Sequence, residues 1–232
     1  MQFAAFVLPL VLLQSGGKLE KKDTKVGTGP AAEEYDLLTM DYTGKLKDGT
    51  VFDSSKKPGH TPFQFVIGGG MVIKGWDQGI LGMKVGGVRT LVIPPDLGYG
   101  DHAAPGGAIP ANSTLTFEVE LKAIHKCDYT IVTKGTGNGA KAGDSIQCNV
   151  VGKLASGTAI LGTKEKPISA PVTLGRTPMP FQGLAQAFYG MKLGEKRTVK
   201  IPSEFALGTR STPQIPANSG MVFEIELVKF LK

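Results

Sequence analysis

The chain has 232 residues, of which 41% are hydrophobic and 20% are charged, a balance that excludes an intrinsically disordered protein. Its 32 Gly and 15 Pro residues indicate a globular protein rich in loops and strands, and its length suits two domains. The net charge of +6 arises because residues 18–126 carry 13 basic and 13 acidic side chains, whereas residues 127–232 carry 13 and 7. This excess either aids solubility or attracts an acidic partner or an anionic surface. No compact run of Lys and Arg is interleaved with aromatic residues, so we expect no nucleic-acid partner.

The first residues form an apolar run, 3–13, that is too short to cross a bilayer but has the length of the apolar core of a secretory signal. We therefore interpret residues 1–17 as a signal peptide or a flexible leader. No Lys or Arg precedes the run, so a mis-assigned start or a buried strand is the alternative. We expect an exported protein, in a bacterial periplasm or secreted, with a cytoplasmic location as the alternative, and no stable membrane insertion.

Hydrophobic alternation, helical spacing and turn residues predict the elements of the first half. The segment 18–36 is polar and turn-rich, and the segment 96–112 is a long loop of Gly, Pro and Ala. One good helical pattern covers residues 75–83 and stops at two glycines. Strands are predicted at 37–46, 51–52, 62–67, 88–93 and 114–124, with an Asp-Gly turn before the second.

The second half repeats the first. GMKVGGVRTLVIP (82–94) recurs as GMKLGEKRTVKIP (190–202), and IPANSTLTFEVEL (109–121) recurs as IPANSGMVFEIEL (215–227). The copies are 106 to 108 residues apart, which is a domain length rather than the period of a solenoid. The chain is therefore a tandem duplication, with domains predicted at 18–126 and 127–232. Its second set of strands is predicted at 145–154, 171–174, 198–201 and 221–230, with a helix at 183–191.

These elements predict an α+β fold, in which two similar domains each wrap an antiparallel sheet around one short helix. The last strand of the first domain runs almost directly into Tyr129, which leaves a linker of only a few residues. We therefore expect restricted motion between the domains.

The two cysteines, Cys127 and Cys148, flank the start of the second copy. If the protein is exported, a disulfide between them is permitted and would contribute about 3 kcal/mol in the chain-entropy model. Two buried thiols are an equal alternative. Two Cys and 3 His without the spacing of metal ligands predict no structural zinc site, and we expect neither a metal nor a cofactor.

The first copy holds more aromatic side chains than the core of so small a domain needs. The surplus predicts an apolar pocket. The aromatic residues are Tyr42, Phe52, Phe63, Phe65, Trp76, Tyr99 and Phe117.

Six motifs in register carry a resemblance to a known family. They are MDYTG, DGTVFDSS, PFQFVIG, MVIKGW, LVIPPDLGYG and IPANSTLTFEVEL, in this order within residues 26–124. Together they resemble the FKBP-type peptidyl-prolyl isomerases. The resemblance implies a peptidyl-prolyl cis-trans isomerase that assists protein folding, acts on proline-containing polypeptides and binds macrolide immunosuppressants.

The resemblance also implies the site. Trp76 would be the pocket floor, the Ile73 N–H and the Tyr99 hydroxyl would donate to substrate carbonyls, and Ile109 would lie on a loop above the pocket. Asp53 would face the site and pair with Tyr42, with turn capping as the alternative. The implied catalytic residues are Tyr42, Asp53 and Tyr99, and the implied substrate-binding residues are Phe52, Phe63, Val72, Ile73, Trp76, Ile109 and Phe117.

Such a pocket suits prolyl isomerisation, because turning an X–Pro bond breaks amide resonance at a barrier of about 20 kcal/mol. A twisted amide is less polar than a planar one, so a dry pocket favours the twisted form without a nucleophile or a metal. The alternative function is a chaperone or interaction module in which isomerase activity is incidental.

The second copy lacks these pocket residues, and only Ile215 and Phe223 match Ile109 and Phe117. We therefore predict an inactive second domain with a structural, dimer-forming or substrate-holding role. The replacements are Val150 for Tyr42, Ile160 for Phe52, Leu161 for Asp53, Ala170 for Phe63, Val172 for Phe65, Phe181 for Ile73, Leu184 for Trp76 and Leu207 for Tyr99.

Overall fold

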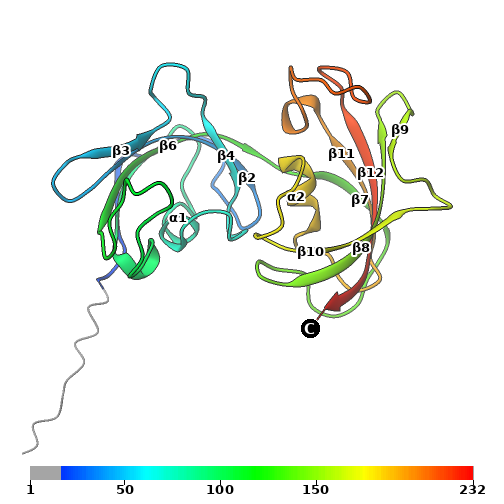
Figure 1. Ribbon diagram of the computed structural model, residues 1–232, viewed down its shortest axis with the longest axis horizontal. Helices are drawn as coiled ribbons and strands as arrows, with labels where there is room; N and C mark the ends of the chain where they lie inside the picture. Colours follow the sequence, from blue (N-terminus) through cyan, green and yellow to red (C-terminus); the bar gives the residue numbers. More distant parts are fainter. Residues whose placement is uncertain (1–16, 232) are drawn as a thin grey trace, which may run out of the picture.

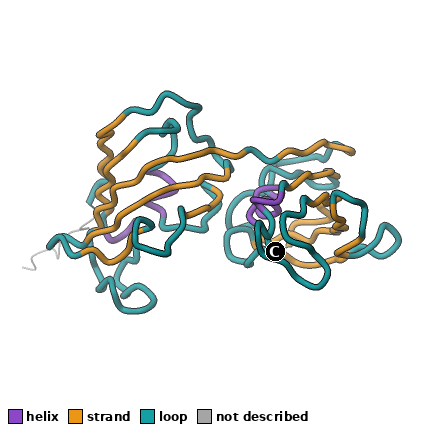
Figure 2. Tube along the Cα trace, turned by 90° about the horizontal axis from the view of Figure 1, so that it is seen from above, coloured by secondary structure: helices purple, strands orange, loops and turns teal. Residues whose placement is uncertain are grey.

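The computed structural model describes residues 17–231, so residues 1–16 of the predicted leader lie outside the described part. Two antiparallel sheets each wrap around a short helix (Figures 1 and 2), which confirms the predicted α+β tandem fold. The first sheet contains β1 (Glu20–Lys25), β2 (Leu37–Lys45), β3 (Val51–Ser54), β4 (Phe63–Val66), β5 (Val88–Ile93) and β6 (Leu115–His125), around α1 (Lys74–Gly79). The second contains β7 (Asp128–Thr133), β8 (Ser145–Leu154), β9 (Ala159–Leu161), β10 (Ile168–Thr173), β11 (Lys196–Ile201) and β12 (Met221–Leu231), around α2 (Gln182–Phe188).

The two sheets have the same topology. The strand order of the first sheet is β1-β5-β6-β2-β3, with β4 also paired to β2. Given from the equivalent edge, the order of the second sheet is β7-β11-β12-β8-β10, with β9 also paired to β8. The register agrees as well, because Tyr42 lies opposite Val119 in the first sheet and Val150 lies opposite Ile225 in the second. Val150 therefore occupies the position of Tyr42, as the sequence alignment of the copies predicts.

Two edge strands, β1 and β7, lie in segments where we predicted no strand. All six residues of β1 and all six of β7 are exposed, so neither strand has the alternation that marks a half-buried strand. Both are held by main-chain pairing, β1 to β5 and β7 to β11. The short strand β9 was also not predicted. The helix α1 ends at Gly79, earlier than predicted, because a turn with Gly82 at φ 77° follows it.

Glycines let each helix lie against its sheet. A Cβ on Gly75 would come within 2.4 Å of the Ile93 side chain, and a Cβ on Gly79 within 2.8 Å of the Leu91 side chain. In the second domain, a Cβ on Gly183 would lie 2.7 Å from Ile201. Real Cβ atoms do not approach so closely, so only glycine allows this packing distance between α1 and β5.

One arginine in each copy fixes the end of the helix. The Arg89 guanidinium donates to the Gly79 carbonyl oxygen at 2.7 Å and pairs with Asp23 at 2.6 Å. At the equivalent position, Arg197 donates to the carbonyl oxygens of Ala187 and Tyr189 at 2.9 and 3.0 Å. Cationic side chains at the last carbonyls of a helix satisfy acceptors that have no partner within the helix.

The two domains are in direct contact. In the sequence β6 ends at His125 and β7 begins at Asp128, so the boundary predicted between residues 126 and 127 falls between these strands and stays a prediction. In Figure 1, α2 lies on the side of the second domain that faces β2 and β4. Leu37 and Val66 of the first domain are fully buried in the core of the second.

Polar and aromatic contacts add to this interface. The Tyr189 hydroxyl donates to the Gly69 carbonyl oxygen at 2.8 Å, and the Tyr189 ring stacks on Tyr35 with centroids 4.7 Å apart. The Gln186 side chain donates to the carbonyl oxygens of Tyr35 and His125 at 2.9 and 3.0 Å. The second helix is therefore tied to three segments of the first domain.

Both cysteines are free thiols, so of the two alternatives the structure has the thiols rather than the disulfide. Burial raises the pKa of Cys127 to about 11 and that of Cys148 to about 12. Thiols with raised pKa values are poorly reactive. Within residues 17–231, none of the helices has the length and apolar character to cross a membrane.

We expect Tyr189→Phe to lower the free energy of unfolding by about 1–3 kcal/mol, because it leaves the buried Gly69 carbonyl oxygen without its donor. Tyr129→Phe is the matched control, since Tyr129 is 41% exposed and its ring instead packs under Arg197. Denaturant titrations of the full chain measure both. Losses that agree within about 0.5 kcal/mol would contradict a stabilising role of the Tyr189 hydroxyl.

Candidate functional site

A cavity of about 210 Å³ opens between the sheet of the first domain, α1 and the loop that follows η1 (Pro95–Leu97). Nine of the ten predicted site residues line this cavity, together with Met71. The lining residues are Tyr42, Phe52, Asp53, Phe63, Met71, Val72, Ile73, Trp76, Tyr99 and Phe117.

Trp76 forms the floor of the cavity. It lies on α1, is 4% exposed, and meets the rings of Tyr42 and Phe117 edge-on, with centroids 5.3 and 5.2 Å away. Phe63 also packs edge-on, at 6.1 Å. Aromatic rings prefer edge-to-face contacts, so the floor and walls hold one another in place.

A glycine on β2 allows two of the walls to meet. A Cβ on Gly44 would lie 2.5 Å from the Phe52 ring and 2.8 Å from the Phe117 ring. Because glycine has no Cβ, these rings pack against β2 and against each other, with centroids 5.5 Å apart. Gly44 therefore sets the width of this side of the cavity.

One carboxylate faces the cavity and is hydrogen-bonded on both oxygens. Asp53 accepts from the Tyr42 hydroxyl at 2.5 Å and from the Ser54 N–H at 2.8 Å, so it pairs with Tyr42 and also bonds to its own turn. Burial, this hydrogen bond and the negative charge of Asp53 raise the pKa of Tyr42 well above its usual value. The Tyr42 phenol therefore stays protonated at physiological pH and remains the donor to Asp53.

Side-chain hydroxyls fix the hairpin that carries Tyr42 and Asp53. The Ser55 hydroxyl accepts from the Tyr42 N–H at 2.9 Å and donates to Asp41 at 2.8 Å. The Ser54 hydroxyl donates to the Tyr42 carbonyl oxygen at 3.0 Å. Both serines are buried, so the Tyr42 and Asp53 side chains stand on a rigid base.

Three hydrogen-bond donors around the cavity have no acceptor within residues 17–231. They are the N–H of Ile73, the hydroxyl of Tyr99 and the indole N–H of Trp76. Ile73 is the residue before α1, and Tyr99 is 38% exposed. Unpartnered donors beside an apolar cavity can bond to acceptor groups of a ligand, such as carbonyl oxygens.

Ile109 is the predicted site residue that does not line the cavity. It is 5% exposed and belongs to the core cluster of the first domain. Its carbonyl oxygen accepts from the Ala104 N–H at 3.0 Å, which folds the loop so that the Ile109 side chain turns inward. Its part in substrate binding stays a prediction.

Sequence reasoning missed Met71, which is 38% exposed and directly precedes Val72 and Ile73 in the MVIKGW motif. A signal was present, since an apolar residue next to two predicted pocket residues is a candidate for the same rim. Among the described residues, no group of His, Cys, Asp and Glu side chains is arranged to hold a metal ion.

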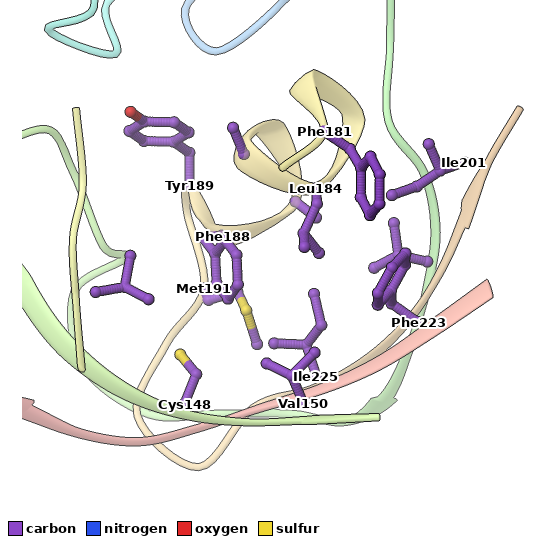
Figure 3. Close-up of a cluster of buried hydrophobic side chains, with 14 of the residues drawn as sticks. Cys148, Val150, Phe181, Leu184, Phe188, Tyr189, Met191, Ile201, Phe223 and Ile225 are labelled. Atoms are coloured by element: carbon purple, nitrogen blue, oxygen red, sulfur yellow. The ribbon is translucent and has the colours of Figure 1, made fainter. Parts of the chain in front are cut away.

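The equivalent region of the second domain is filled by its own side chains. Phe181, Leu184 and Phe223 lie between α2 and the sheet (Figure 3), and each is at most 8% exposed. The rings of Phe181 and Phe223 are 6.0 Å apart. The positions of Trp76 and Ile73 are thus occupied by residues of a packed core.

Comparisons with known proteins agree with this architecture. The model of one family, described as FKBP-type peptidyl-prolyl cis-trans isomerase, matches residues 29–122 and 137–228. These segments cover most of the chain, which therefore belongs to the FKBP-type peptidyl-prolyl cis-trans isomerase family, with two copies of the family's domain in tandem.

Three relatives illustrate the similarity. The chain is 57% identical over 99 residues, 43% of its length, to FK506-binding protein 4 of Aspergillus fumigatus. It is 59% identical over 91 residues, 39% of its length, to human peptidyl-prolyl cis-trans isomerase FKBP2. It is 30% identical over 218 residues, 91% of its length, to mouse peptidyl-prolyl cis-trans isomerase FKBP10.

The matches span 19% of the fungal relative, 63% of the human one and 37% of the mouse one. All three are eukaryotic proteins, so the predicted bacterial periplasmic location has no support.

We expect Gly44→Ala to shift the emission of Trp76, the only tryptophan of the chain, because the added methyl group displaces the rings of Phe52 and Phe117. The matched control is Gly152→Ala, whose Cβ would lie 2.6 Å from Phe223 in the second domain. It should cost stability without changing Trp76 emission in the folded protein. Fluorescence spectra of both variants measure this, and identical shifts would contradict the local effect.

Proposed function

We propose that this chain is a peptidyl-prolyl cis-trans isomerase whose active site is the aromatic cavity of the first domain. The observation that carries the proposal is the combination of an apolar cavity over Trp76 with free donors at Ile73 and Tyr99. Membership of a family described by this activity supports it.

The cavity would act by binding the twisted amide more tightly than the planar one. The pyrrolidine ring of proline sits on Trp76 between the rings of Tyr42, Phe63 and Phe117. The apolar walls exclude water from the X–Pro carbonyl, which favours the less polar, twisted form. Each 1.36 kcal/mol of preferential binding gives about a tenfold rate increase, and no covalent intermediate is formed.

Polar groups at the rim would orient the chain. The Ile73 N–H and the Tyr99 hydroxyl donate to substrate carbonyl oxygens on either side of the cavity. Asp53 fixes the Tyr42 ring through their 2.5 Å hydrogen bond and presents a negative charge to the amide as its polarity changes. Phe52 and Val72 complete the walls.

The second domain is proposed to be catalytically inactive. Supporting this, Leu184, Leu161 and Leu207 stand at the positions of Trp76, Asp53 and Tyr99, so the floor, the carboxylate and the phenol donor are lost together. Its role is then structural or substrate-holding.

The proposed isomerase function implies a class of ligands and a class of substrates. Macrolide immunosuppressants should fill the first cavity, and the name of the fungal relative, FK506-binding protein 4, says that that protein binds FK506. Substrates are proline-containing polypeptides, and the apolar run at residues 3–13 supports export, so clients are folding proteins outside the cytoplasm.

We expect the full chain to accelerate cis-to-trans isomerisation of a proline tetrapeptide in a protease-coupled assay. The double variant Asp53→Leu with Tyr99→Leu should lower kcat/KM at least about tenfold, equivalent to about 1.4 kcal/mol of transition-state stabilisation. Both side chains are partly exposed, so the fold should tolerate the change.

The matched control is Leu161→Ala with Leu207→Ala, the equivalent positions of the second domain. Activity within about twofold of the unmodified chain is expected, because the second domain contributes no turnover. Equal losses in the two double variants would contradict the assignment to the first cavity. A full chain no faster than the spontaneous reaction would contradict the proposed activity, and suppression of aggregation would then be the activity to measure.

A further inference from the structure

A second cavity, of about 160 Å³, lies between the domains beside the first one. Met71 lines both cavities, so they meet at this side chain. All other residues of the second cavity come from the second domain: Leu174, Gly175, Arg176, Thr177, Pro178, Met179, Gln182, Ala185 and Tyr189.

The position of this cavity relative to the first is fixed by close contacts. A Cβ on Gly175 would lie 2.1 Å from the Gly69 carbonyl oxygen, which also accepts the hydrogen bond from Tyr189. A Cβ on Gly70 would lie 3.5 Å from the Ala142 methyl group. The chain that leads into Met71 and Val72 is therefore pressed against the second domain.

The second cavity has the chemistry of a polypeptide-binding surface. Leu174, Pro178 and Met179 supply apolar contacts, and methionine adapts to side chains of different shape. The Oε1 atom of Gln182 is buried and has no donor among the described residues. Buried acceptors are almost always satisfied, so this oxygen is open to a hydrogen-bond donor from a molecule bound in the cavity.

The two orphaned atoms point to one ligand rather than two. Among side chains of residues 17–231, the only buried polar atoms without partners are the indole N–H of Trp76 and the Oε1 of Gln182. One belongs to each cavity, and Met71 joins them. At about 210 and 160 Å³, each cavity alone is smaller than the roughly 300–1,000 Å³ of independent small-molecule sites.

We propose that the second cavity binds the part of the substrate that extends beyond the few residues held in the first cavity, so that the degenerate domain forms the second half of an extended polypeptide groove. This inference rests on the proposed isomerase function, since the proline in the first cavity anchors the chain. The occupant is the same unfolded polypeptide, which passes over Met71 and places a neighbouring side chain against Pro178 and Met179.

The charge of the second domain predicts which substrate residues the groove prefers. Arg176 is exposed and is the one charged side chain among the lining residues. The second domain also holds the whole positive excess of the chain. An acidic residue close to the proline is therefore favoured and a basic one disfavoured.

The test uses the full chain with three substrates: a proline tetrapeptide, which occupies the first cavity only, and two longer peptides that carry Glu or Lys at positions flanking the same core. Arg176→Glu should lower kcat/KM for the Glu peptides and raise it for the Lys peptides, by about two- to fivefold each, the effect of one partly exposed charge. Both changes should shrink at high salt. Tetrapeptide turnover should not change.

The matched control is Arg210→Glu, an exposed arginine of the same domain that lines neither cavity. It makes the same change in net charge, so both variants share any long-range electrostatic effect. Beyond that shared effect, Arg210→Glu should leave all three rates unchanged. Glu and Lys peptides that respond alike to Arg176→Glu and Arg210→Glu would overturn the groove. Absence of tetrapeptide turnover in the unmodified chain would instead overturn the isomerase proposal, so the two failures are distinguishable.

Discussion

The close packing of each helix into the concave face of its sheet is the constraint on which the rest of the structure depends. Gly75 and Gly79 bring α1 against Ile93 and Leu91, and Arg89 ties the end of the helix to the sheet. Without this approach the indole of Trp76 could not reach Tyr42 and Phe117. The position of the cavity floor therefore depends on the contact between α1 and β5, while Gly44 sets the spacing of the walls formed by Phe52 and Phe117.

The second copy shows that this helix packing does not depend on the residues that line the cavity. The second copy keeps the glycine at Gly183 and the arginine at Arg197, and its helix packs in the same way. What differs is the side chains that the helix presents. In the first copy Ile73 before the helix lies at the rim, and the larger Trp76 one turn later forms the floor.

In the second copy the sizes are reversed, with Phe181 at the helix start and Leu184 one turn later. Phe181 fills the space above the sheet and lies against Phe223. The loss of rings at Val150 and Ala170 leaves room for Phe181, so an open site becomes a closed core on an unchanged scaffold.

Much of this was predictable because it depends on local pattern and on the repeat. Alternation located the strands of both cores, and equal spacing of the two copies fixed which residues are equivalent. Aligning Gly44 with Gly152 predicts the register of Phe117 and Phe223, which the strand pairings confirm. The nine residues that line the first cavity came from the family motifs, because each motif lies on one wall.

The features that were missed depend on long-range contacts. The residues of β1 and β7 are all exposed, so no alternation marks them, and only the free edges of β5 and β11 make them strands. Ile109 lies in the core of the first domain rather than in the cavity lining, and its part in substrate binding stays a prediction. Periodicity within one domain likewise carries no information about a partner domain.

The interface shows how the second helix came to differ from the first. Only Gly75, Trp76 and Gly79 are buried in α1, whereas six of the seven residues of α2 are buried. Gln78 of α1 is exposed, while Gln186 at the equivalent position is 7% exposed and bonds to two carbonyl oxygens of the first domain.

The equivalent residues Leu81 and Tyr189 differ in the same way. Leu81 packs against the core of its own domain, but Tyr189 in its place reaches Gly69, three residues before the pocket residue Val72. The second copy has thus exchanged an inward-facing pocket for an outward-facing helix surface. A domain held against the loop that leads into the first cavity limits how that rim can move, so residues far from Trp76 help to define the shape of the cavity.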